Sequence, residues 1–98
     1  MTVQIIENWT ELEGQVQSVV PAPDVAQHVI VEIRVRRTGA VEGFANLLAK
    51  AAGTVVRVHV ASDVAKKVGL AAGVQVRCRV RRGDPERVFA HPTEIHAQ

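Results

Sequence analysis

Alternation of valine with polar residues is the sequence feature that most constrains this chain. Residues 28–36 read HVIVEIRVR, with Val29, Val31, Ile33 and Val35 at one parity and Ile30, Glu32, Arg34 and Arg36 at the other. Because successive side chains of a strand point to opposite faces, this pattern predicts a strand with one buried face that ends at the Thr38-Gly39 pair. β-Branched valine packs well on a pleated surface, which favours the same interpretation.

Four further segments are predicted as strands, three of them on the same grounds. Residues 11–20 place Leu12, Gly14, Val16 and Ser18 inward, and Gly14 indicates a bend at a barrel corner. Residues 54–61 place Val56, Val58 and Val60 inward and Val55, Arg57 and His59 outward. Residues 73–82 place Val74, Val76, Cys78 and Val80 inward and Gln75, Arg77, Arg79 and Arg81 outward. A fifth strand runs from Arg87 to Ala90 and on towards Ile95, weakened by Pro92.

Two segments show helical features. Residues 63–70 predict a short helix that Ser62 or Asp63 caps and Gly69 ends, with Lys66 and Lys67 in solvent. Residues 41–53 fit either a short helix or an ordered loop, and the helical spacing of their apolar residues predicts a helical turn with Gly53 as its C-cap. Gly83 to Glu86 supply the turn residues of a hairpin between the last two strands.

Length and composition indicate one small domain over residues 1–98. Ninety-eight residues cannot enclose a second core, and the expected core includes Val16, Val31, Ile33, Val58, Val60, Val76 and Val80. The single cysteine, Cys78, excludes an internal disulfide, and we expect it to be a buried, inert thiol. The first residues show neither a signal peptide nor a long apolar run, so we expect a cytoplasmic protein with no membrane partner.

The predicted order of three strands, one helix and two strands resembles an OB-fold barrel over residues 10–96. The bend-prone Gly14 and the phrase GLAAGVQVRCRV, which follows the short helix, carry this resemblance. It implies a five-stranded all-β barrel that binds single-stranded nucleic acid on its second and third strands. The phrase from Val68 to Val74 also resembles molybdate-binding barrels, although Ile6-Glu7 stands before Asn8 where those barrels have Ser-Ala-Arg.

The candidate site is the outward face of the second and third strands. Period-two placement puts Arg34, Arg36, Arg57 and His59 on one surface, and Phe44, between these strands, is a candidate for base stacking. The alternative is that these residues are only solvated, because the outer face of any half-buried sheet is polar. Phe89 is predicted in the core, Trp9 over a barrel end, and the fourth-strand arginines on another wall.

Catalytic and metal-binding chemistry finds no support in the sequence. The four histidines and Cys78 lack metal-ligand spacing, and no phosphate-binding loop or nucleophile motif occurs. We therefore expect a non-enzymatic protein without a cofactor. Three functions remain open: a module for single-stranded DNA or RNA; a protein-interaction module, or homo-oligomer, that docks through a barrel edge or residues 41–53; and an oxyanion-binding barrel.

Overall fold

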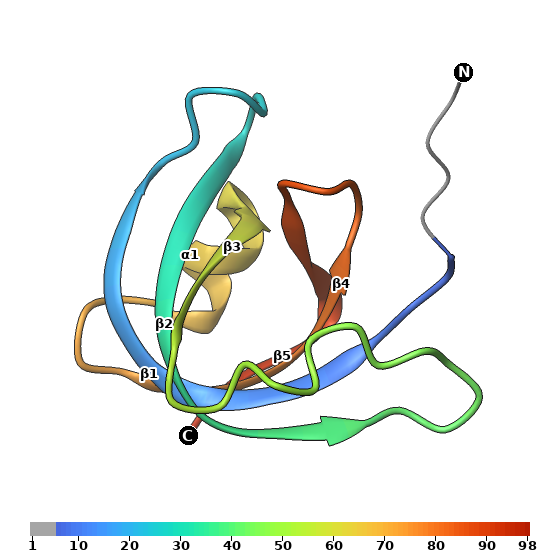
Figure 1. Ribbon diagram of the computed structural model, residues 1–98. Coiled ribbons are helices and arrows are strands. Elements are labelled where there is room, and N and C mark those ends of the chain that lie inside the picture. Colours follow the sequence, from blue (N-terminus) through green and yellow to red (C-terminus); the bar gives the residue numbers. More distant parts are fainter. Residues whose placement is uncertain (1–5) are drawn as a thin grey trace.

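The computed structural model describes residues 6–98 as a closed five-stranded β-barrel with one short helix (Figure 1). The elements are β1 (Thr10–Pro21), β2 (His28–Ala40), β3 (Val55–Ala61), α1 (Ser62–Val68), β4 (Gln75–Arg82) and β5 (Val88–Ala97). The strands are arranged in the order β1-β2-β3-β5-β4, and β1 pairs with both β2 and β4. The predicted all-β barrel with a helix between β3 and β4 is confirmed, and the arrangement is compatible with an OB-like barrel.

The inward faces of all five strands form the core. All seven residues expected there are at most 1% exposed. The helix α1 packs against β2, β3 and β5, where Ala65 is buried and Val64 and Val68 pack against the core. Burial of apolar surface is the main favourable contribution to folding, so this valine-rich interior is what stabilises the barrel. No helix within residues 6–98 is long and apolar enough to cross a membrane.

The inward and outward side chains of β1 exchange places where its pairing with β2 is irregular. A register shift lies between Val16 and Ser18, and beyond it Val19 packs against the core. The expectation that Ser18 faces inward is wrong: its hydroxyl donates to Glu32 Oε1 at 2.7 Å on the outside. An extra residue in one strand reverses the parity of those that follow, a change that simple alternation does not predict.

Gly14 lies at the other register shift of β1, where the sequence predicted a bend. It pairs with Val35 of β2 and with Val76 of β4, so two strands approach it at once. A Cβ atom at this position would lie inside contact distance of the Arg34 carbonyl oxygen and 2.9 Å from Ile33 Cγ2. Only glycine fits, because the neighbouring atom is backbone and cannot move independently of the sheet.

Two buried polar side chains anchor the start of the described chain, Asn8 to Arg82 of β4 and Thr10 to residues 41–53. Asn8 donates to the carbonyls of Ile6 and Arg82 and accepts from the Arg82 amide, which leaves no amide proton for an external anion. Thr10 Oγ1 contacts Asn46 Oδ1 at 2.6 Å and accepts from the Leu48 amide. The Thr10 contacts, together with the Trp9 amide that donates to the Ala45 carbonyl at 3.1 Å, hold residues 41–53 as an ordered loop of turns. The predicted helical turn with a Gly53 C-cap does not form.

The remaining elements differ from the prediction mainly at their ends. β2 continues past Thr38-Gly39 to Ala40, because Gly39 still pairs with Glu11. The helix begins at Ser62 after Ala61, and neither Ser62 nor Asp63 caps it, whereas Gly69 ends it at φ +80° as expected. β5 runs through Pro92 because residues 91–94 bulge outward between the Ala90–Val80 and Cys78–Ile95 pairs, where the missing amide proton costs no ladder bond.

Replacement of Gly14 by alanine should destabilise the barrel by about 1–3 kcal/mol or more, since the added methyl overpacks a closed backbone contact. The expected fall in Tm is about 4–8 °C per kcal/mol for a domain of this size, measured by thermal denaturation. The matched control is Gly39→Ala, whose Cβ would meet only Glu11 Cβ at 3.6 Å. Equal Tm values for the two variants would contradict this account of the β1 bend.

Cys78 should resist thiol reagents in the native state and react rapidly in denaturant. Its side chain is 1% exposed in β4, and burial raises the pKa of the thiol to about 12. Since the thiolate is the reactive species, neither access nor ionisation favours attack. The measurement is the rate of labelling by a chromogenic disulfide with and without denaturant. Rapid labelling of the native protein would show that the Cys78 side chain of β4 points outward.

Candidate functional site

The outward side chains of β2 and β3 form two adjacent rows. In one row Arg57 of β3 lies opposite Glu32 of β2, and in the other Val55 lies opposite Arg34. Arg34 is next to Gln15 on β1, which in turn pairs with Gln75 on β4. The structure therefore brings Arg34 and Arg57 to one face as diagonal neighbours, and Arg34 has only uncharged side chains directly opposite it on both flanking strands.

Arg36 also lies beside Arg34, although it has no paired residue on β1. The pairing of β1 with β2 passes from Gly14–Val35 to Glu13–Arg37, so Arg36 is the extra residue of a bulge. Its guanidinium donates to Gln75 Oε1 at 3.1 Å. Together with Arg34 and Gly53 it lines a hollow of about 320 Å³. The two arginines thus present their guanidinium groups around one shallow depression.

The ion pairs of Arg36 and Arg57 are longer than those of Arg87. Arg36 lies 3.7 Å from Glu13, and Arg57 lies 3.9 Å from Glu32, with 58% and 63% of their side chains exposed. Within residues 6–98, Arg34 makes no ion pair. By contrast, Arg87 approaches two carboxylates at 2.7 Å each. Long, exposed pairs contribute little stability, so the β2–β3 arginines are readily available to another anion.

His59 is not part of this accessible face, which corrects the sequence-based expectation. Its side chain is 6% exposed, and its ring packs against Phe89 with centroids 5.2 Å apart. Nε2 lies 3.2 Å from Asp24 Oδ1, and Nδ1 has no partner. Its β2 neighbour Ile30, also predicted outward, is 4% exposed. Loop 22–27 covers both residues. The alternation within a strand does not show whether a loop covers the strand's outer face.

An ion-pair clasp joins that loop to the β4–β5 hairpin. Arg87 Nε donates to Asp24 Oδ2 at 2.7 Å, and its Nη1 donates to Asp84 Oδ2 at 2.7 Å. Both connections lie at the same end of the barrel (Figure 1). The hydrogen bonds from Arg87 and then His59 lower the pKa of Asp24 to about 2. Arg87 likewise lowers the pKa of Asp84. The clasp holds loop 22–27 over His59, so this end of the β2–β3 face is covered rather than accessible.

The aromatic side chains do not gather beside the arginines. Phe44 is 39% exposed in loop 41–53, but it does not line the hollows that Arg34, Arg36 and Arg57 border. Phe89, predicted in the core, is half-buried on the outside of β5 between His59, His28 and the guanidinium of Arg81, 5.8 Å from the ring centroid. Trp9 is half-buried against His91. The structure therefore places no aromatic ring where Phe44 was expected to stack.

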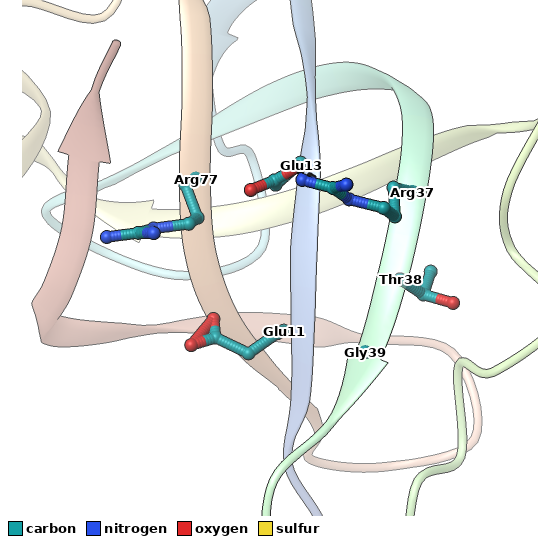
Figure 2. A pocket seen from close by; sticks show the side chains of 6 residues that line it. All are labelled: Glu11, Glu13, Arg37, Thr38, Gly39 and Arg77. Atoms are coloured by element: carbon teal, nitrogen blue, oxygen red, sulfur yellow. Dashed lines mark hydrogen bonds and ion pairs between the residues drawn. The ribbon is translucent and has the colours of Figure 1, made fainter.

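A wall of mixed charge occupies the outside of β1, β2 and β4. Glu13 of β1 lies between Arg37 of β2 and Arg77 of β4 in the register, and Glu11 lies 3.3 Å from Arg79. Figure 2 shows the Arg37 guanidinium directed towards Glu13 and that of Arg77 directed away. The hollow here, about 310 Å³, opens over Gly39. Glu13 and Glu11 balance the charges of Arg37 and Arg79 on this wall, whereas Arg77 is exposed and makes no ion pair within residues 6–98.

Sequence reasoning missed a second concave surface, the β3 groove. It measures about 370 Å³ and lies between residues 47–57 and the β4–β5 hairpin, lined among others by Leu47, Lys50, Val55, Arg57, Arg82 and Glu86. Leu47 and Val55 are 41% and 43% exposed. Since the hairpin and residues 47–57 are far apart in the chain, only the fold assembles this set. The exposed apolar residues within 41–53 were the available sequence signal.

Comparison of the chain with models of known protein families, with curated protein sequences and with solved structures finds no match in any of the three. The functional argument therefore rests on the geometry of the barrel itself.

The clasp should make stability depend on pH through Asp24. The pKa of this carboxylate is lowered in the fold from 3.8 to about 2, so its stabilising contribution is present above pH 3.8 and is lost as pH falls towards 2. Thermal denaturation between pH 5 and pH 2 should show a steeper fall in Tm for the wild type than for Asp24→Asn. Parallel curves for the two proteins would mean that the clasp contributes nothing to folding.

Proposed function

We propose that this protein is a non-enzymatic module that binds single-stranded DNA or RNA on the outer face of β2 and β3. The observation that carries the proposal is the set of three exposed guanidinium groups on this face, Arg34, Arg36 and Arg57, whose ion pairs are long or absent within residues 6–98. The face of strands 2 and 3 is where OB barrels bind oligonucleotides, and this barrel has a compatible strand order.

Phosphate neutralisation would supply most of the binding free energy. A guanidinium donates two parallel hydrogen bonds to phosphate oxygens, and each neutralised phosphate releases counterions. Glu32 is the acidic residue that opposes Arg57 on this face, at 3.9 Å, and a phosphate can replace so long a contact at small cost. The interface reads the backbone charge, so we expect weak dependence on base sequence.

Base stacking has a smaller role than the sequence predicted. Phe44 does not border the hollows beside the arginines, and His59 is buried under loop 22–27. Guanidinium planes stack on bases, so Arg34 and Arg57 serve both charge and stacking. Without aromatic stacking, which contributes about 1–3 kcal/mol per base, affinity is expected to be modest.

The salt dependence of oligonucleotide binding tests this proposal. Contacts with two to three phosphates predict a slope of log K against log salt of about −1.4 to −2.1, at about −0.7 per phosphate. Replacement of Arg34 and Arg57 by glutamine should flatten that slope and weaken binding to all sequences alike, as measured by fluorescence anisotropy at several salt concentrations.

The matched control removes two positive charges from elsewhere on the barrel. Lys66→Gln with Lys67→Gln changes exposed residues of α1, away from the β2–β3 rows, and should leave the slope nearly unchanged. The proposal is wrong if the wild type binds no oligonucleotide at low salt, or if the lysine variant loses as much affinity as the arginine variant.

A further inference from the structure

β3 has an open edge within an otherwise closed barrel. On one side it pairs with β2 along its whole length, from Val55–Arg34 to Ala61–His28. On the other side it pairs with β5 only at Val58 and His59. Residues 55–57 therefore have no paired residue on that side among residues 6–98, and Val55 lies three residues before the first pair with β5.

The β3 groove lies along this open edge. Val55 and Arg57 belong to the edge itself, and Arg82 and Glu86 of the β4–β5 hairpin form the opposite wall. Closed barrels abolish strand edges, and proteins usually cover or charge those that remain. Here the edge also borders a concave surface, with the start of β3, which has no paired residue on this side within residues 6–98, on one wall.

The groove combines apolar surface with positive charge. Leu47 and Val55 are among the most exposed large apolar side chains within residues 6–98. Lys50, Arg57 and Arg82 bring three cations to its lining, against one acid, Glu86. Within the described chain, Lys50 and Arg82 make no ion pair, and Arg82 is oriented by a hydrogen bond to the Pro85 carbonyl at 3.1 Å. The fitting ligand is therefore extended, partly apolar and acidic.

We propose that the β3 groove docks an extended acidic segment of a partner protein, which adds to β3 as a further strand. The segment's backbone pairs with residues 55–57, its alternate apolar side chains contact Leu47 and Val55, and its acidic side chains face Lys50 and Arg82. In strand addition the backbone hydrogen bonds provide affinity while alternate side chains provide specificity. An unstacked nucleic-acid strand uses the positive charge but cannot continue the β3 ladder, which favours a peptide here.

The test uses a seven-residue synthetic peptide of alternating glutamate and valine, acetylated and amidated, titrated against the intact protein by calorimetry. Two further peptides carry N-methyl groups on either the valines or the glutamates, which removes backbone donors from one edge at a time. One of the two should bind more weakly, by about two- to tenfold for each hydrogen bond lost, and the other should bind like the parent. The amides of residues 55–57 should also gain protection from hydrogen exchange.

Two pairs of variants distinguish the groove from general attraction. Leu47→Asp should abolish peptide binding, whereas Val20→Asp, at a residue equally exposed but outside the groove, should not. Lys50→Glu should weaken binding and Lys66→Glu on α1 should not. All four side chains are exposed or partly exposed, so circular dichroism should show an unchanged fold.

Failure of this proposal is distinguishable from failure of the nucleic-acid proposal. Arg34 does not line the groove, so Arg34→Gln should weaken oligonucleotide binding and leave peptide binding unchanged. Strand addition is overturned if the parent peptide does not bind, or if both N-methylated peptides bind as well as the parent. It is also overturned if Leu47→Asp weakens oligonucleotide binding while no peptide binds, because the groove then belongs to the nucleic-acid interface.

Discussion

The close approach of three backbones at Gly14 is the constraint on which the barrel depends. β1 pairs with β2 along its length and with β4 along its first half, and Gly14 belongs to both ladders. A side chain there would separate β1 from β2 at Arg34 and open the sheet. The barrel closes between β3 and β5 through only two paired positions, and the β3 groove lies beside that short contact.

The fold could be predicted from the sequence because its signals are local. Period-two patterns placed four of the five strands, and the seven expected core residues are buried, because the direction of each side chain in a strand follows from its position in the alternation. An error arose where β1 departs from strict alternation, at Ser18, which lies beside a bulge that shifts parity. Loop 41–53 was predicted to contain a helical turn because its apolar spacing indicates burial but not the hydrogen bonds that Thr10 and the Trp9 amide make to it.

The candidate site was only partly predictable, because its boundary depends on distant contacts. Arg34 and Arg57 could be placed together, since strand pairing follows from the predicted order. The burial of His59 could not be predicted, because Asp24 and Arg87, 63 positions apart, clasp the loop that covers it. Phe89, predicted in the core, lies instead on the outside of β5 beside His59. Neither Asp24 nor Arg87 belongs to the local pattern of β3. A residue predicted to point outward was therefore not exposed.

The placement of acids explains how a weakly charged chain acquires a basic surface. The formal net charge is only +2, yet Glu11 and Glu13 on β1 oppose Arg37 and Arg79, so the opposite charges balance on that wall. Arg34, Arg57, Lys50 and Arg82 supply the cations between the β2–β3 face and the β3 groove, whereas Arg77 and Arg81 on β4 and Lys66 and Lys67 on α1 are exposed elsewhere. Arg57 borders both proposed surfaces, since it is the diagonal neighbour of Arg34 and lines the groove. A phosphate that takes up Arg57 removes one of three groove cations, so the two surfaces are thermodynamically coupled, each ligand weakening the other by the same factor.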